Sequence, residues 1–253
     1  MRLLQDDGNG NLSLVEYHDG KIPPYAILSH TWGPDGQEVT FKDLMEGTGR
    51  DKSGFEKIKF CRERAASDGI QHFWVDTCCI DKSSSAELSK AINSMFRWYQ
   101  NADQCYVFLS DVSTSRNTAD HQSSNTTWEA AFRGSRWFRR GWTLQELIAP
   151  ASVEFFSREG DWLGSKKTLE QDIHKITGIA IEALRGGPLP DFAVEERMSW
   201  AKRPKRRETT DPEDRAYSLL GVFNVFMPLL YADVEENAFA RLQEEIRKFV
   251  KCK

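Results

Sequence analysis

A tryptophan and a glutamate lie four residues apart in the segment RRGWTLQELIAP, residues 139–150. A carboxyl group can transfer a proton or stabilise a positive charge, and a neighbouring indole can stack on a planar ligand and exclude water. If the segment is an α-helix, Trp142 and Glu146 share one face, roughly opposite the face of its leucine and isoleucine residues. Such a pair either lines a pocket or lies beneath another segment with the carboxylate in solvent, and the spacing alone leaves both readings open.

Polar side chains also gather where three apolar segments end. In an open parallel sheet, ligands bind beyond the carboxyl ends of the strands. The same polar endings are found on strands without a site, so this pattern alone indicates only a candidate location. The residues at these ends are Ser29, His30, Asp76, Cys78, Ser110 and Asp111, with Trp32 two positions after His30.

The elements that position these residues alternate between strand and helix patterns. Near-continuous apolar strands separated by helices are typical of a parallel sheet covered on both faces. We expect strands at 25–30, 72–80, 105–111 and 152–156, and helices at 54–69, from Ser84 to about 102, and within 139–150. Ser84 and Glu87 have the spacing of a capping box, which supports a helix start there.

The last third of the chain has a different pattern. Its segments TLEQDIHKITG, DPEDRAYSLLGVF and EENAFARLQEEIRKFV are all helical in type, and Asp211-Pro212 is a typical helix start. We therefore expect one domain over residues 1–253, with an α/β part at 1–165 and a helical extension at 166–253 that packs on it. The polar stretch 113–127 is expected to be a loop.

Composition limits the class of protein. The 253 residues carry a net charge of −4 and 40% hydrophobic residues, which supports a folded core and no general attraction for nucleic acid or membrane. The basic run at 202–208 is explained by a solvated loop. The beginning of the chain has no apolar signal-like region, no segment is apolar enough to span a bilayer, and the five cysteines include an adjacent pair. We expect a cytoplasmic protein without a membrane or nucleic-acid partner.

Other chemistries have weaker support. Cys78 with His30 and Asp76 could form a nucleophilic site, but adjacent cysteines at a strand end are more often small buried residues. The spacing of Cys and His residues does not fit a zinc site, so we expect no metal. The chain also lacks the glycine-rich motifs GxxxxGK[ST] and GxGxxG of phosphate-binding loops.

Several long motifs resemble one family. PYAILSHTWG, FWVDTCCIDK, SMFRWYQNADQCYVFLSDV, WFRRGWTLQELIAP and RETTDPEDRAYSLLGVF are similar to the HET (heterokaryon incompatibility) domain of filamentous fungi, from about residue 1 to the final helical segment. The likeness is closest to HET domains at the N-terminus of fungal NLR-like proteins, ahead of nucleotide-binding and WD-repeat regions. The chain departs from the family pattern YGEGxxNAF at Ala232 and Val234, which replace glycines.

The family resemblance implies a fold and an activity. HET domains trigger programmed cell death and are distantly similar to TIR domains, which have a flavodoxin-like sheet and in many cases hydrolyse NAD. GWTLQEL resembles the TIR segment WCxxEL, and the position of its catalytic glutamate matches Glu146, beside Trp142. The resemblance thus implies a catalytic Glu146, with NAD as substrate and no cofactor. Ser29, His30, Trp32, Asp76 and Ser110 are candidate substrate-binding residues by their place at the strand ends.

Two functions remain open from the sequence. The first is an NAD glycohydrolase that becomes active when the domain self-associates within a longer parent protein. The alternative is a non-catalytic, TIR-like adaptor that acts in the same death pathway by homotypic contact.

Overall fold

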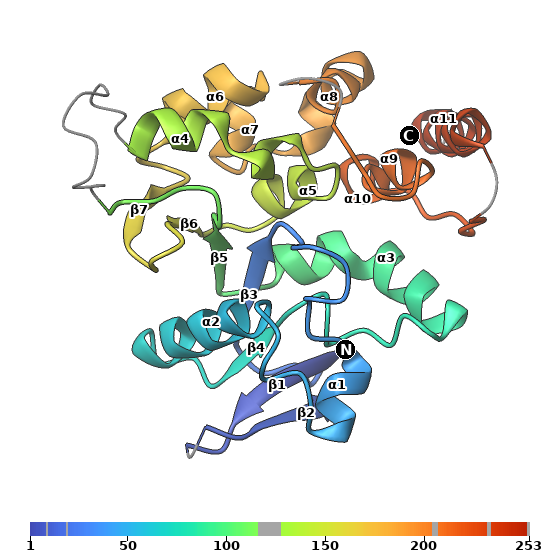
Figure 1. Cartoon of the computed structure of the whole chain (residues 1–253). Helices are drawn as coiled ribbons and strands as arrows, with labels where there is room; N and C mark the ends of the chain where they lie inside the picture. Colours follow the sequence, from blue (N-terminus) through green and yellow to red (C-terminus); the bar gives the residue numbers. More distant parts are fainter. Residues whose placement is uncertain (9, 19, 116–127, 204–206, 232–233, 252–253) are drawn as a thin grey trace.

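A computed structural model describes residues 1–253 except 9, 19, 116–127, 204–206, 232–233 and 252–253 (Figure 1). Its strands are β1 (Arg2–Asp6), β2 (Leu12–Glu16), β3 (Tyr25–His30), β4 (His72–Trp74), β5 (Gln104–Phe108), β6 (Val153–Phe156) and β7 (Trp162–Ser165). The helices up to β7 are α1 (Phe41–Glu46), α2 (Phe55–Ser67), α3 (Ser85–Gln100), α4 (Trp128–Gly134), the 3₁₀ turn η1 (Arg136–Arg139) and α5 (Thr143–Ile148). Those after β7 are α6 (Glu170–Thr177), α7 (Ile181–Leu184), η2 (Leu189–Asp191), α8 (Val194–Trp200), α9 (Asp214–Tyr217), α10 (Leu220–Phe223) and α11 (Glu235–Lys251).

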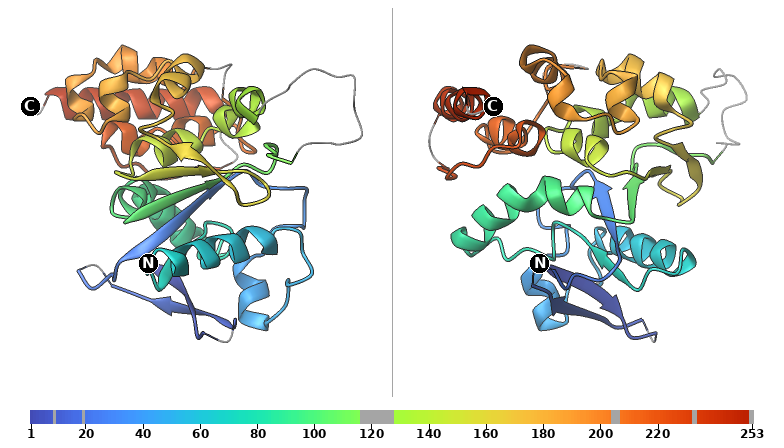
Figure 2. Two further views of the ribbon diagram at one scale, coloured as in Figure 1. Left: turned by 90° about the vertical axis from the view of Figure 1, so that its left-hand side faces the viewer. Right: turned by 180° about the vertical axis from the view of Figure 1, so that it is seen from behind.

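Four parallel strands form the centre of the sheet. The sheet order is β2-β1-β4-β3-β5-β6-β7, and β4, β3, β5 and β6 pair in parallel. Numbered along the chain, these four strands have the order 2-1-3-4 of a flavodoxin-like sheet. Helices α2 and α3 lie on opposite sides of the strands (Figure 2, left). The predicted α/β fold with a parallel sheet between helices is therefore confirmed.

The sheet edges are antiparallel, which the sequence analysis missed. β1 and β2 form a hairpin that joins β4, and β7 pairs antiparallel with β6. Residues 72–80 were expected to be one strand, but β4 stops at Trp74 because the chain turns, with the amides of Cys78 and Cys79 both bonded to the carbonyl of Val75. Asp76 therefore lies in the first turn beyond the strand.

The helix starts differ in how well they follow the expected signals. Ser84 caps α3 as expected, accepting a hydrogen bond from the Glu87 amide, while the Glu87 carboxylate bonds instead to the Asp81 amide. Asp211-Pro212 does not begin a helix: the chain first forms a turn, and α9 starts at Asp214. The segment that follows divides into the short helices α9 and α10.

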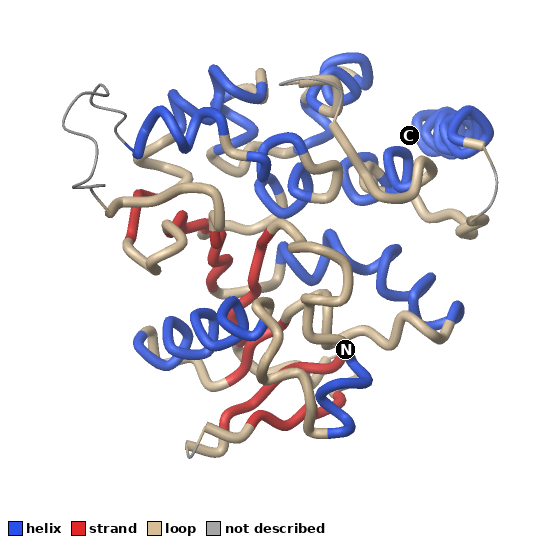
Figure 3. The backbone as a smooth tube through the Cα atoms, in the orientation of Figure 1, coloured by secondary structure: helices blue, strands red, loops and turns tan. Residues whose placement is uncertain are grey.

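The helical extension packs on the α/β part, and the described chain after β7 consists of helices and loops (Figure 3). α10 lies against α3 so closely that a Cβ atom added to Gly221 would be 2.0 Å from the Cβ of Phe96. Ala232, one of the two departures from the family pattern, lies outside the described residues, and so does most of the predicted loop 113–127. Val234 is exposed, and its carbonyl accepts the amide of Asn237 in the first turn of α11.

We predict that Gly221→Ala destabilises the protein, because the added methyl group forces α10 away from α3. An overpacked contact of this kind costs about 1–3 kcal/mol of unfolding free energy, measured by urea unfolding. Gly134→Ala is the matched control, since its Cβ would meet no atom within 4 Å. Equal stability of the two variants would contradict this account of the α3–α10 contact.

Candidate active site

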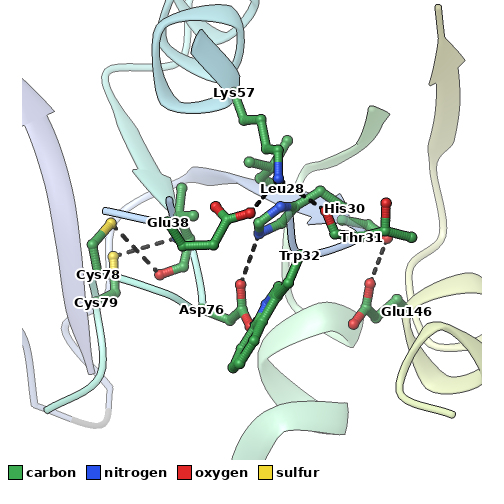
Figure 4. Close-up of polar contacts among 12 residues, drawn as sticks. Leu28, His30, Thr31, Trp32, Glu38, Lys57, Asp76, Cys78, Cys79 and Glu146 are labelled. Carbon is green, nitrogen blue, oxygen red and sulfur yellow. Dashed lines mark hydrogen bonds and ion pairs between the residues drawn. The ribbon is translucent and has the colours of Figure 1, made fainter. Parts of the chain in front are cut away.

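Glu146 is fixed in the interior by two neighbouring side chains. It lies on α5 with only 7% of its surface exposed, and every residue of α5 is buried rather than one face alone. The Ser29 hydroxyl donates to Glu146 Oε2 at 2.5 Å, and Trp137 Nε1 donates to the Ser29 oxygen at 2.8 Å. Figure 4 shows Glu146 facing the end of β3. The end of the first parallel strand therefore holds this carboxyl group in place.

The surroundings of Glu146 favour its neutral form. Burial raises its pKa to about 8, the negative charge of Asp76 adds to this effect, and the hydrogen bond from Ser29 and the charge of Arg140 offset it only in part. Near neutral pH most of the group is therefore protonated. A cation placed beside it would favour the carboxylate, so the group is suited to stabilising positive charge.

A second polar cluster lies at the ends of β3 and β4. Asp76 accepts hydrogen bonds from His30 Nε2 and Trp32 Nε1, both at 2.9 Å (Figure 4). The Lys82 ammonium lies 4.0 Å from Asp76 Oδ2 and 3.8 Å from the centre of the Trp32 ring. Burial acts to raise the pKa of Asp76, but Lys82 and the two hydrogen bonds outweigh it and hold that pKa well below its usual range.

A third cluster comes from the helical extension. Asp214 at the start of α9 accepts hydrogen bonds from Trp142 Nε1 and from the Tyr231 hydroxyl, both at 3.0 Å. Burial raises the pKa of Asp214 to about 6, although both hydrogen bonds favour its charged form. A residue of the helical extension, Asp214, thus fixes the indole of Trp142.

These three clusters surround one cavity of about 300 Å³. α5 supplies one wall, the loops after β3 and β4 a second, and the segment containing Asp211 and Asp214 a third. Apolar side chains of α3, including Ile92 and Met95, complete the lining. The extension therefore does not fill the space over Trp142 and Glu146 but forms one wall of a cavity there.

Most of the residues predicted from the sequence come together here. His30, Trp32, Asp76, Trp142 and Glu146 line the cavity. Ser29 lies behind Glu146 as its hydrogen-bond donor and is fully buried. Ser110, in contrast, is exposed just beyond β5 and is not among the described residues that line the cavity.

The sequence analysis did not assign to the site several lining residues that carry charge or hydrogen bonds. Among them are Lys82, Arg140, Asp214 and Tyr231. Lys82, Arg140 and Asp214 lie inside motifs quoted for the family resemblance, and Tyr231 begins the segment compared with the family pattern YGEGxxNAF. These motifs do not indicate that Tyr231 lies beside Asp214, because only the return of the chain after α10 brings the two together.

Alternative chemistries gain no support from the geometry. Cys78 is completely buried, and burial and the neighbouring Cys79 raise the pKa of its thiol well above the ordinary value, so it carries no thiolate. Within the described residues, no group of three His, Cys, Asp or Glu side chains is arranged to hold a metal ion. No helix in that part of the chain has the length and apolarity to cross a membrane.

Comparisons with known proteins agree on one family. Residues 25–131 match the model of the family described as heterokaryon incompatibility protein (HET). The whole chain is 56% identical to the vegetative incompatibility protein HET-E-1 of Podospora anserina, and it spans 18% of that protein's length. No solved structure matches the chain. The chain belongs to the heterokaryon incompatibility (HET) family.

Proposed function

We propose that this domain is a cell-death effector of heterokaryon incompatibility that hydrolyses NAD at the bond between nicotinamide and ribose. The family and the name of the Podospora relative support the incompatibility role. In this proposal the domain acts in the cytoplasm as part of a longer protein, and self-association switches the activity on. In this proposal NAD is the substrate, and the reaction requires no cofactor.

The observation that carries the enzymatic part is the buried carboxyl group of Glu146 at a cavity that Trp142 also lines. A protein gains no stability from holding a glutamate with a pKa of about 8. Strongly shifted carboxyl groups in cavities are characteristic of functional sites. NAD suits a site with a carboxyl group beside an indole, because its nicotinamide ring is cationic and planar.

The proposed reaction breaks the C1′–N bond, and its electron pair goes to the nicotinamide nitrogen, which becomes neutral. Positive charge moves to the ribose C1′ and ring oxygen, as in glycoside hydrolysis. The ionised Glu146 stabilises this charge and accepts hydrogen bonds from ribose hydroxyls, while Trp142 stacks on a ring and excludes water. Water then adds to C1′ and releases a proton, which gives ADP-ribose and nicotinamide.

We predict that Glu146→Gln lowers NAD hydrolysis by at least about 100-fold, because an uncharged amide cannot stabilise the developing cation. Wild type and variant are compared at high concentration or after artificial clustering, with nicotinamide release as the measurement. Glu63→Gln, which changes an exposed glutamate of α2, is the control and keeps wild-type turnover.

The same variants separate the enzyme from an adaptor. If Glu146→Gln also fails to kill cells that express it, while Glu63→Gln kills them, death requires the carboxyl group. If clustered wild type leaves NAD intact, or if the folded Glu146→Gln variant kills as well as wild type, the enzymatic proposal is wrong and a TIR-like adaptor takes its place.

We further predict that Glu146→Gln stabilises the protein in a pH-dependent manner. Above pH 4.5 the unfolded chain releases the Glu146 proton, whereas the folded protein holds it until about pH 8, so wild-type stability falls across this window. The gain from the variant should therefore grow by about 3 kcal/mol between pH 5 and pH 8. Urea unfolding at both pH values measures it, and a pH-independent difference would contradict the raised pKa.

A further inference from the structure

A second cavity, of about 700 Å³, lies on the other side of α3 and α5 from the Glu146 cavity. Its walls are formed by α3, with Phe96 and Arg97, by the end of α5, and by η2, α8 and α10. Phe249 of α11 also lines it. Figure 2 (right) shows α3 from behind, beneath the helices of the extension. This volume lies within the range of about 300–1,000 Å³ that is usual for sites of small organic ligands.

The lining of this cavity is positively charged and aromatic. Among the described residues that line it, the charged side chains are Arg97 and Arg197, and no aspartate or glutamate occurs. Phenylalanine rings supply much of the remaining surface, from Phe96, Phe192, Phe223, Phe226 and Phe249. Phe226 is 61% exposed, which is unusual for a large apolar side chain and places an accessible aromatic ring at this site.

Among the lining residues, Arg197 is a buried cation with an unsatisfied hydrogen-bond donor. It is 91% buried on α8, where its Nη1 donates to the carbonyl of Val222 at 3.0 Å and its guanidinium lies 4.7 Å from the centre of the Phe223 ring. Its buried Nε has no acceptor. A buried cation without an anionic partner is unfavourable. A bound anion would give Arg197 the negative charge and the hydrogen-bond acceptor that the described residues do not provide.

We propose that this cavity binds an aromatic anion, a planar ring system that carries a phosphate, sulfonate or carboxylate group. Arg197 pairs with the anionic group, and Arg97, which is exposed on α3, adds positive charge at the entrance. The phenylalanine rings hold the planar part by stacking and edge contacts. The site is separate from Glu146 and needs no NAD hydrolysis, so it stands even if the enzymatic proposal fails.

The fluorescent aromatic sulfonate 8-anilinonaphthalene-1-sulfonate tests this proposal on the folded 253-residue chain. We expect one saturable site, from which AMP, an aromatic phosphate, displaces the probe while adenosine does not. Binding of the probe without displacement by AMP, or equal displacement by adenosine, would overturn the assignment of an aromatic anion. Displacement by oleate alone would show an aliphatic ligand and would overturn it too.

Two variants locate the site. Arg197→Met keeps a side chain of similar length and should weaken probe binding at least about tenfold, and Arg97→Gln, at an exposed position, should weaken it about two- to fivefold. Arg133→Met, which changes an exposed arginine of α4, is the matched control with unchanged affinity. If Arg197→Met fails to fold, Arg97→Gln still tests whether the probe binds in this cavity. Wild-type affinity in a folded Arg97→Gln protein would show that the probe binds elsewhere and would overturn the proposal.

Discussion

The hydrogen bond between Ser29 and Glu146 joins the two halves of the candidate site, and much of the surrounding structure serves to make it possible. It requires that β3 end beside β5, that α5 enter the interior, and that Trp137 occupy the other side of the serine hydroxyl. This arrangement lies at the ends of β3 and β5, and the connections that follow these two strands lead in opposite directions, to β4 and to β6. Doubly wound sheets bind their ligands at such a position. Burying this carboxyl group lowers the stability of the folded protein near neutral pH, because burial raises its pKa to about 8.

The helical extension is part of the site rather than an addition to it. Asp214 and Tyr231 line the cavity, and Asp214, which accepts a hydrogen bond from Tyr231, orients Trp142. The close contact of Gly221 with Phe96 sets how near α10 lies to α3. An isolated α/β part would therefore leave Trp142 without its hydrogen-bond partner and Glu146 open to water. Since water stabilises charge, an open site would also lose the raised pKa.

The sequence predicted the centre of the molecule better than its edges. Apolar strands and the capped helix α3 carry strong local signals, and the resemblance to TIR domains directed attention to Glu146. The hairpin β1–β2 was missed although glycines mark its turn, and β7 is too short for its pattern to be distinctive. Asp214 and Tyr231 could not be assigned to the site, because their role depends on how short helices fold back on the sheet. Ser110 follows β5 closely in the sequence, but it lies in the turn beyond the strand and is exposed.

The central claim is that Glu146 is a buried carboxyl group that is mostly protonated near neutral pH and becomes charged beside a cation. A carbon-13 NMR titration of the glutamate side chains, assigned by comparison with Glu146→Gln, measures this directly. The account predicts a pKa near 8 for Glu146 in the free protein and a marked decrease when a carbocyclic NAD analogue that resists hydrolysis is bound. A pKa near the ordinary 4.5 in the free protein, or no change with the analogue, would contradict it.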